Sequence, residues 1–227
     1  MKNTRISDVD WEKDIYSKGL QLNDWPFTEV VSDIMKLTSG MDKKKLRILE
    51  IGCGACNNLW FAAEVGFQIS GLDISKSAID YGKSRLEGLG FTDLDLKVGD
   101  ITKLDWEDDY FDIVLDRGAL TQNNYERIGE CLDEAFRVLK KGSGVMLSYT
   151  LFGLNSTDRI YGREVSRNTY DFFSEGFFSR VGLTSFFTEE DLRELFSKFE
   201  DIDVKKQLIE HSATNYKMDS YSVICRK

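Results

Sequence analysis

Four apolar segments of this chain each end in a carboxylate, and the first runs directly into a glycine-rich turn. Predicted helices alternate with such segments over much of the chain. Strands that alternate with helices indicate βαβ units and therefore a parallel sheet. In an open parallel sheet, ligands bind in the crevice beyond the carboxyl ends of the strands. We therefore expect one acidic crevice, rimmed by Glu50, Asp73, Asp100 and Asp116.

The predicted elements follow from apolar periodicity and turn residues. Pro26 fits the first turn of a helix, and Gly40 ends that helix. The pattern predicts an α/β fold with a doubly wound sheet, closed by an antiparallel pair of strands over 201–210 and 215–225. The other expected strands cover residues 46–51, 67–73, 94–99, 111–116 and 144–150, and the other expected helices cover 57–65, 75–88, 122–139 and a segment that begins at Thr188.

The composition argues against several classes of function. A chain of 227 residues is expected to form one domain with additions. Its net charge of −9 argues against a nucleic-acid partner, because binding phosphates needs a basic face. No stretch approaches the roughly 18–20 apolar residues of a membrane span, and no signal peptide is visible before Asp8 and Asp10. Four cysteines in that setting indicate reduced thiols and a cytoplasmic location.

The acidic crevice restricts the ligand that it would accept. Four carboxylates at one edge of a sheet would repel a phosphate group. They would suit a ligand with a positive charge, a pair of ribose hydroxyls and an exocyclic amine. S-adenosylmethionine carries all three groups and has no phosphate, so it is the cofactor that the pattern favours.

The turn Gly52-Cys53-Gly54 follows an apolar strand and precedes a helix. Asp73 lies 19 residues after Gly54, the spacing at which a carboxylate reaches ribose hydroxyls. A dinucleotide-binding turn would have a third glycine at position 57, where this chain has Asn57. Glu50 also fits a phosphate ligand poorly. An NAD-dependent oxidoreductase is therefore a disfavoured alternative, and a non-catalytic cofactor-binding regulatory protein is a second one.

Together these segments resemble the motifs of class I S-adenosylmethionine-dependent methyltransferases of the small-molecule type. The resemblance covers about residues 40–150. It implies a Rossmann-like methyltransferase fold, with a mostly parallel seven-stranded sheet and an antiparallel last strand, and it implies S-adenosylmethionine as the cofactor. The matching segments are Glu50–Gly54, Leu72–Ser75, Gly99–Ile101 with Leu104, Phe111–Asp116 and Ala135–Ser143.

The resemblance also assigns residues to the parts of the cofactor. The methionine end is expected at the glycine turn, the ribose at the end of the second strand, and the adenine beside the second and third strands. The expected residues are Glu50, Gly52 and Gly54 at the methionine end, Asp73 at the ribose, Ile74 against the adenine, Asp100 and Ile101 at the adenine amine, and Cys53 and Asp116 to complete the set.

The chain departs from the family pattern at two places. Cys56 stands where the first motif commonly has its third glycine. After the fourth strand, many small-molecule members have a histidine, whereas residues 117–122 of this chain contain none. The sequence therefore offers no base from that motif.

Asp116 and His211 are the candidate catalytic residues. Asp116 is interpreted as a base or a substrate-positioning group, and the alternative is a carboxylate that caps a nearby backbone turn. His211 is the only histidine of the chain, and it would be a useful base near neutral pH. The alternative for His211 is an exposed residue at the end of a strand.

Cys53 and Cys56 form a C-x-x-C pattern at a helix start. One interpretation is a redox pair, because a helix amino terminus stabilises thiolates. The other is two small residues in a cofactor-binding turn, and this second interpretation is favoured because the ligand would occupy the turn. The sequence predicts no metal site, since the remaining cysteines are isolated and there is one histidine.

The regions around the core are expected to shape the site. Trp11, Tyr16 and Trp25 are expected to pack over the cofactor mouth. The aromatic residues after the fifth core strand are interpreted as a substrate lid or as the core of an inserted subdomain. The expected regions are an N-terminal helical cap over 1–40, the cofactor-binding core over 41–150, an inserted substrate lid over 151–187, and a C-terminal helix and strand pair over 188–227 that completes the sheet.

The expected function is methyl transfer from S-adenosylmethionine to a nitrogen or oxygen of a small-molecule acceptor. An anionic or nucleotide-linked acceptor is a hypothesis, based on the four insert arginines Arg159, Arg163, Arg167 and Arg180. The alternative for these arginines is surface pairing with the equally numerous Asp158, Glu164, Asp171 and Glu175. A homodimer remains an open alternative.

Overall fold

The computed structural model describes residues 9–211, 213 and 216–227, which form an α/β fold around a seven-stranded sheet. The strand order in this sheet is β3-β2-β1-β4-β5-β10-β9. Its strands are β1 (Arg47–Ile51), β2 (Gln68–Asp73), β3 (Asp95–Val98), β4 (Ile113–Arg117), β5 (Val145–Phe152), β9 (Glu200–His211) and β10 (Tyr216–Arg226).

The strand directions confirm the predicted fold class. β1 to β5 run parallel to one another, whereas β10 pairs antiparallel with both β5 and β9. In the register of the central strands, Glu50 of β1 lies beside Gly71 of β2 and Leu115 of β4. The carboxyl ends of β1, β2 and β4 therefore meet at one edge of the sheet, where ligands bind in folds of this kind.

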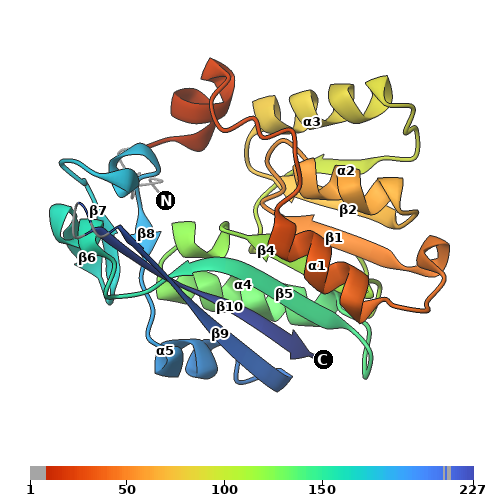
Figure 1. Cartoon of the computed structure of the whole chain (residues 1–227). Coiled ribbons are helices and arrows are strands. Elements are labelled where there is room, and N and C mark those ends of the chain that lie inside the picture. Colours follow the sequence, from red (N-terminus) through yellow and green to blue (C-terminus); the bar gives the residue numbers. More distant parts are fainter. Residues whose placement is uncertain (1–8, 212, 214–215) are drawn as a thin grey trace.

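Helices cover both faces of the sheet (Figure 1). One face carries α1 (Thr28–Leu37), α2 (Asn57–Glu64) and α3 (Lys76–Gly88), and the other carries α4 (Tyr125–Val138) and α5 (Glu189–Leu195). Within the described part of the chain, the helices are too short or too polar for any of them to cross a bilayer.

Side-chain caps explain where several helices begin. The Ser75 hydroxyl accepts from the Ala78 N–H at the start of α3, and Thr188 forms a capping box with Asp191 at the start of α5. Asn124 caps α4, which begins at Tyr125 rather than at the predicted residue 122. The difference arises because residues 120–122 form a separate 3₁₀ turn before the cap.

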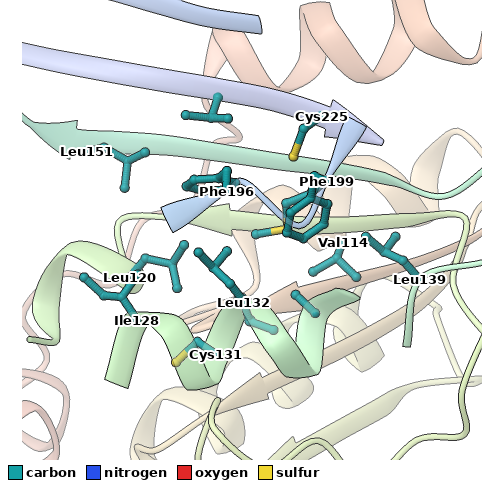
Figure 2. Packing of buried hydrophobic residues seen from close by; sticks show 14 of the residues in the cluster. Val114, Leu120, Ile128, Cys131, Leu132, Leu139, Leu151, Phe196, Phe199 and Cys225 are labelled. Atoms are coloured by element: carbon teal, nitrogen blue, oxygen red, sulfur yellow. The ribbon is translucent and has the colours of Figure 1, made fainter. Parts of the chain in front are cut away.

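The two faces of the sheet carry separate apolar clusters. In β4, Val114 packs toward α4 and α5, whereas Ile113 and Leu115 pack toward α1, α2 and α3. This alternation is the two-residue period of a strand. Figure 2 shows the α4 side, where Val114 lies near Leu132 of the helix and Phe196 after α5. Burial on both faces fixes the register, so the carboxyl ends of the strands are held in place.

The insert after β5 is an ordered layer with its own apolar core. It contains a three-stranded sheet of β6 (Arg163–Ser166), β7 (Thr169–Asp171) and β8 (Thr184–Ser185). Phe178 and Phe186 are fully buried there and pack against Phe152 of β5. The weak periodicity of this region predicted no strands, because strands of two to four residues leave little pattern in a sequence.

The segment before α1 is fixed to the start of α3. It contains a π-helical turn over Trp11–Ile15 and a 3₁₀ turn over Tyr16–Lys18. The Glu12 carboxylate accepts hydrogen bonds from the Ser77 N–H at 3.0 Å, the Ser77 hydroxyl at 2.7 Å and the Ser75 hydroxyl. These hydrogen bonds lower the pKa of Glu12. Within the predicted N-terminal helical cap over 1–40, the described residues form two short helical turns followed by α1. Residues 1–8 of that region lie outside the described part of the chain.

Candidate functional site

Two adjoining cavities lie at the carboxyl ends of β1, β2 and β4. Their volumes are about 230 Å³ and about 130 Å³. Six residues line both cavities, so the two hollows meet: Trp11, Tyr16, Gly52, Arg117, Gly118 and Gln122. Eight residues of the predicted cofactor set line one cavity or the other: Glu50, Gly52, Cys53, Gly54, Asp73, Ile74, Asp100 and Ile101.

Asp73 is a buried carboxylate at the end of β2 in the wall of the larger cavity. Its two oxygens accept hydrogen bonds of 2.8 Å from the N–H groups of Gly54 and Ser75. Burial raises the pKa of Asp73, and the two backbone hydrogen bonds oppose that rise. Because each carboxylate oxygen has a second lone pair, Asp73 can also accept from ligand hydroxyls while it holds the glycine turn.

Asp100, which lines the same cavity, is held by Arg127. Nη2 of Arg127 donates to both carboxylate oxygens at 2.8 and 2.9 Å, and Thr102 donates its N–H and hydroxyl to one of them. Partial burial raises the pKa of Asp100, but the hydrogen bonds from Thr102 and Arg127 outweigh it and the net shift is downward. Arg127 also lines the cavity and is a site residue that the sequence prediction missed.

The glycine turn needs its glycines for space and for backbone conformation. Gly52 has a φ of +65°, and a Cβ there would lie 2.3 Å from Cβ of Ala119. Gly54 has a φ of +49°, and a Cβ there would lie 2.6 Å from the Tyr16 hydroxyl. Cys56 takes the left-handed conformation at φ 59° without being glycine. The cysteine therefore adopts the conformation that the family's third glycine would supply, at a cost of about 1–2 kcal/mol.

Glu50 is a fully buried carboxyl in the wall of the smaller cavity. Its Oε1 accepts a 2.7 Å hydrogen bond from the Asn58 amide, and its Oε2 has no hydrogen-bond partner. Burial raises the pKa of Glu50 to about 8. A buried carboxylate with an unpartnered oxygen is suited to receive a cationic group such as an ammonium.

Arg117, the residue after Asp116, is a second site residue that the sequence prediction missed. It lines both cavities and stacks on the Phe27 ring, with the guanidinium carbon 3.3 Å from the ring centroid. Its Nε is buried and has no hydrogen-bond partner. The available signal was its position at the carboxyl end of a core strand, where ligands bind in parallel sheets.

Thr150 places backbone strain beside the smaller cavity. This β-branched residue of β5 has a φ of +61° and lines the cavity. The register of β5 against β10 shifts at the same point, between the pairs of Leu151 with Tyr221 and of Ser148 with Val223. Bulges and strained residues of this kind are common beside functional sites, and Thr150 and Phe152 after the shift both line the smaller cavity.

Asp116 and His211, the two candidate catalytic residues, line neither cavity. Oδ1 of Asp116 accepts from the N–H groups of Ala119 and Leu120, and its Oδ2 accepts from the Ser148 hydroxyl at 2.6 Å. Burial raises the pKa of Asp116 to about 6. Both oxygens of this buried carboxylate are therefore hydrogen-bonded within the protein, as buried polar groups usually are. The geometry favours the turn-capping interpretation of Asp116.

His211 lies at the exposed end of β9 with its ring against Tyr216. β9 runs parallel to β5, so His211 lies toward the carboxyl-end edge of the sheet, but β5 and β10 separate this outermost strand from β4 and His211 lines neither cavity. The geometry therefore favours the interpretation of His211 as an exposed strand-end residue, and its catalytic role stays a prediction.

The two cysteines of the glycine turn are buried thiols with their sulfur atoms 3.8 Å apart. The contact with Cys56 and the burial raise the pKa of Cys53 well above its usual value. A redox-active cysteine needs a lowered pKa and access to solvent. The geometry thus favours the interpretation of two small residues in a cofactor-binding turn.

The four arginines of the insert line neither cavity. Arg159 donates to the Leu154 carbonyl and the Tyr170 hydroxyl, Arg163 stacks on Phe172, and Arg167 pairs with Asp191 and Glu194. The structure thus places these cations on the surface of the insert. The anion-binding lid that they suggested finds no support in this arrangement.

The aromatic residues divide between core and cavity. Trp11 and Tyr16 line both cavities as predicted, whereas Trp25 is 75% exposed and packs edge-on against Trp60. Among the insert aromatics, Phe177 lines the smaller cavity. Phe173, Phe178, Phe186 and Phe187 are buried in apolar clusters.

Comparisons with known proteins agree with this geometry. The chain is 31% identical over 140 residues to the mitochondrial 2-methoxy-6-polyprenyl-1,4-benzoquinol methylase of Danio rerio, covering 61% of this chain and 40% of that protein. It is 26% identical over 185 residues to the demethylmenaquinone methyltransferase of Bacillus velezensis, covering 79% and 76%. The chain spans half or less of the length of two curated relatives that it matches.

A comparison with solved structures and a match to a family model agree with these relatives. A solved structure of an S-adenosylmethionine-dependent methyltransferase from Methanosarcina mazei matches with a TM-score of 0.69 and 21% identity, covering 89% of this chain and 98% of that one. The family model described as a methyltransferase domain matches residues 42–170, more than half of the chain. The predicted family, fold and cofactor are thereby confirmed, and the chain belongs to the class I S-adenosylmethionine-dependent methyltransferases.

Proposed function

We propose that this protein transfers the methyl group of S-adenosylmethionine to a nitrogen or oxygen of a small-molecule acceptor. The observation that carries the proposal is the pair of adjoining cavities. The larger one, with Asp73 and Asp100 on its walls, suits the adenosine part of the donor. The smaller one adjoins it, and its Glu50 and aromatic side chains suit the methionine end and a ring-type acceptor in chemical character.

The residues of the predicted cofactor set have distinct roles in this proposal. Asp73 accepts from the ribose hydroxyls, Asp100 from the adenine amine, and Oε2 of Glu50 from the methionine ammonium. The glycine turn brings backbone close to the donor because Gly52 and Gly54 have no side chain. Ile74 and Ile101, both on the wall of the larger cavity, pack against the adenine.

The reaction is a displacement at a sulfonium methyl, and the donor is intrinsically reactive. Catalysis can therefore come from holding the acceptor atom in line with the methyl group and excluding water. Trp11 and Tyr16 close over the junction of the cavities. Burial raises the pKa of Tyr16 far above its usual range, so this phenol does not serve as a base. An acceptor that arrives unprotonated, such as an amine or an ionised oxygen, fits such a site best.

The names of the two relatives from Danio rerio and Bacillus velezensis support a ring-type small-molecule acceptor. One is named for a benzoquinol and the other for a demethylmenaquinone. Five aromatic side chains line the smaller cavity here, and aromatic walls suit a planar acceptor: Trp11, Tyr16, Phe27, Phe152 and Phe177.

Calorimetry with S-adenosylhomocysteine and with NADH tests the cofactor. We expect the first to bind and the second not to bind, and the reverse result would contradict the proposal. A screen of aromatic amines and phenols with labelled S-adenosylmethionine then tests transfer, read as a mass increase of the acceptor. Tight binding of S-adenosylhomocysteine with no transfer to any acceptor would favour a non-catalytic cofactor-binding protein.

A further inference from the structure

Arg117 is a cation at the junction of the two cavities without a close anionic partner. Its side chain is 28% exposed, and the buried Nε donates to no acceptor in the described part of the chain. Its ion pair is with Glu29 at 3.9 Å, and that carboxylate is 46% exposed. A separation of this size on an exposed partner contributes little, since exposed pairs are weak. The Nε of Arg117 is therefore removed from water without a hydrogen-bonded anion among the described residues.

The carboxylates nearest to Arg117 are committed to other donors. Asp116 uses its oxygens on Ala119, Leu120 and Ser148. Glu50 shares the smaller cavity with Arg117 but accepts from Asn58, and neither its Oε2 nor the Arg117 Nε has a hydrogen-bond partner. A buried donor that lacks a partner loses about 1–3 kcal/mol of solvation, so such groups normally pair with protein, ordered water or a ligand, and the open cavity beside Arg117 gives access to a ligand.

Phe27 fixes the plane of the guanidinium. The ring lies 3.3 Å below the guanidinium carbon, and the Phe27 N–H is itself held by the Asn58 side chain. The stacked ring covers one face of the guanidinium. The N–H groups of Arg117 remain available for hydrogen bonds in the plane of the guanidinium. These N–H groups match the two oxygens of a carboxylate.

We infer that Arg117 binds an anionic group, a carboxylate, carried by a planar aromatic acceptor in the smaller cavity. The inference rests on the proposed function and names the substrate class of the same site. The aromatic walls from Phe152 and Phe177 receive the ring, and Arg117 receives its charge. The negative charge then lies close to the sulfonium of the donor, which attracts it.

The α-carboxylate of the cofactor is the other source of the same chemistry. It has an alternative partner, because Ala55, Asn57 and Asn58 around the start of α2 line the same cavity. The first N–H groups of a helix stabilise anions. The two sources predict different losses when Arg117 is replaced, so they can be separated by measurement.

The first arm measures S-adenosylhomocysteine affinity by calorimetry in the wild type and in Arg117→Met. We expect the two dissociation constants to agree within about threefold, less than 1 kcal/mol. A loss of more than about tenfold would show that Arg117 holds the cofactor's carboxylate, and it would overturn the inference. Absence of binding in the wild type would contradict the proposed function itself, so the two failures are distinguishable.

The second arm compares benzoate with benzamide, two rings that differ in charge, on the S-adenosylhomocysteine complex by ligand-observed NMR titration. We expect benzoate to bind the wild type at least about tenfold more tightly, and the preference to disappear in Arg117→Met. Arg117→Lys keeps the charge without the planar fork, and it should retain part of the preference.

Arg163→Met is the matched control, because Arg163 also stacks on a phenylalanine but lines neither cavity. It should keep the full preference for benzoate. Equal binding of benzoate and benzamide to the wild type would overturn the inference. A preference that survives in folded Arg117→Met, or that is lost equally in Arg163→Met, would overturn it too.

Discussion

The two cavities differ in how their charged side chains are satisfied by the protein. In the larger cavity, Asp73 accepts from two backbone N–H groups, and Asp100 accepts from Arg127 and Thr102. Oε2 of Glu50 in the smaller cavity and Nε of Arg117 at the junction of the two cavities are buried and have no hydrogen-bond partner among the described residues. The carboxylates of the larger cavity thus have hydrogen-bond donors within the protein, whereas the smaller cavity and the junction contain buried polar atoms that a ligand could pair with.

The difference indicates that the two cavities bind different kinds of ligand group. Carboxylates that are already hydrogen-bonded keep a fixed position and can recognise the neutral hydroxyls and amine of a nucleoside. Unpartnered buried groups destabilise the empty protein and gain most when an oppositely charged group binds. The same region holds the strained Thr150, and strain of this kind is concentrated at ligand sites.

Replacement of Asp73 should give the largest effect. Asp73→Ala removes the acceptor for the Gly54 and Ser75 N–H groups as well as for the ribose. We expect S-adenosylhomocysteine affinity to fall about ten- to hundredfold, equivalent to about 1.5–3 kcal/mol. Asp95→Ala, which removes a carboxylate outside both cavities, should leave the affinity unchanged. Unchanged affinity in folded Asp73→Ala would mean that the ribose lies elsewhere.

Glu50 should make the stability of the empty protein depend on pH. Its pKa of about 8 in the fold lies above the ordinary value of 4.5, so the folded state holds a proton that the unfolded chain has lost. This contribution to stability is complete below pH 4.5 and is lost as the pH rises toward about 8. The slope from one such group is at most about 1.4 kcal/mol per pH unit.

Glu50→Gln should remove that slope. Denaturant unfolding at about pH 6, 7, 8 and 9 should show the variant gaining stability relative to the wild type as the pH rises. Asp116, with a pKa of about 6, titrates mainly below this window and is present in both proteins. If the free energies of unfolding of the two proteins changed with pH in parallel, Glu50 would be ionised in the fold throughout this range. The contrast between the two cavities would then rest on Arg117 alone.

Arg127→Met should have a smaller effect on the larger cavity. Asp100 would lose the donor that orients it, but its side chain is 43% exposed and Thr102 still donates to it. We expect S-adenosylhomocysteine affinity to fall about three- to tenfold. Arg193→Met, which breaks an exposed pair on α5, is the control and should have no effect. A loss larger than that of Asp73→Ala would indicate that the adenine, not the ribose, dominates recognition.

Cys56→Gly should have the smallest effect. Glycine adopts the φ of 59° without strain, which stabilises the fold by about 1 kcal/mol, but the variant loses the 3.8 Å contact of the Cys56 sulfur with the Cys53 sulfur. We expect thermal stability and S-adenosylhomocysteine affinity to stay close to the wild-type values. Cys53→Ser should likewise keep methyl transfer within an order of magnitude. Loss of transfer with intact cofactor binding in either variant would restore the hypothesis of a catalytic thiol.

The sequence determined the core sheet and most of the predicted residues that line the two cavities. Each strand from β1 to β5 has a local apolar pattern, and the residues that follow each strand must lie at the same edge because the strands are parallel. Eight of the predicted cofactor residues therefore line the cavities. The glycine turn could also be predicted, because the positive φ angles at Gly52 and Gly54 favour glycine over other residues.

The tertiary structure alone decided which charged groups face a ligand. Asp116 and Arg117 are neighbours in sequence. Asp116 accepts hydrogen bonds from the backbone of the following turn, whereas Arg117 lies at the junction of the cavities. The insert arginines were equally plausible in sequence and lie on the surface, away from the cavities. A charged residue's role depends on the donors, acceptors and rings brought to it by distant segments, and Phe27 and Asn58 are such partners that no local pattern records.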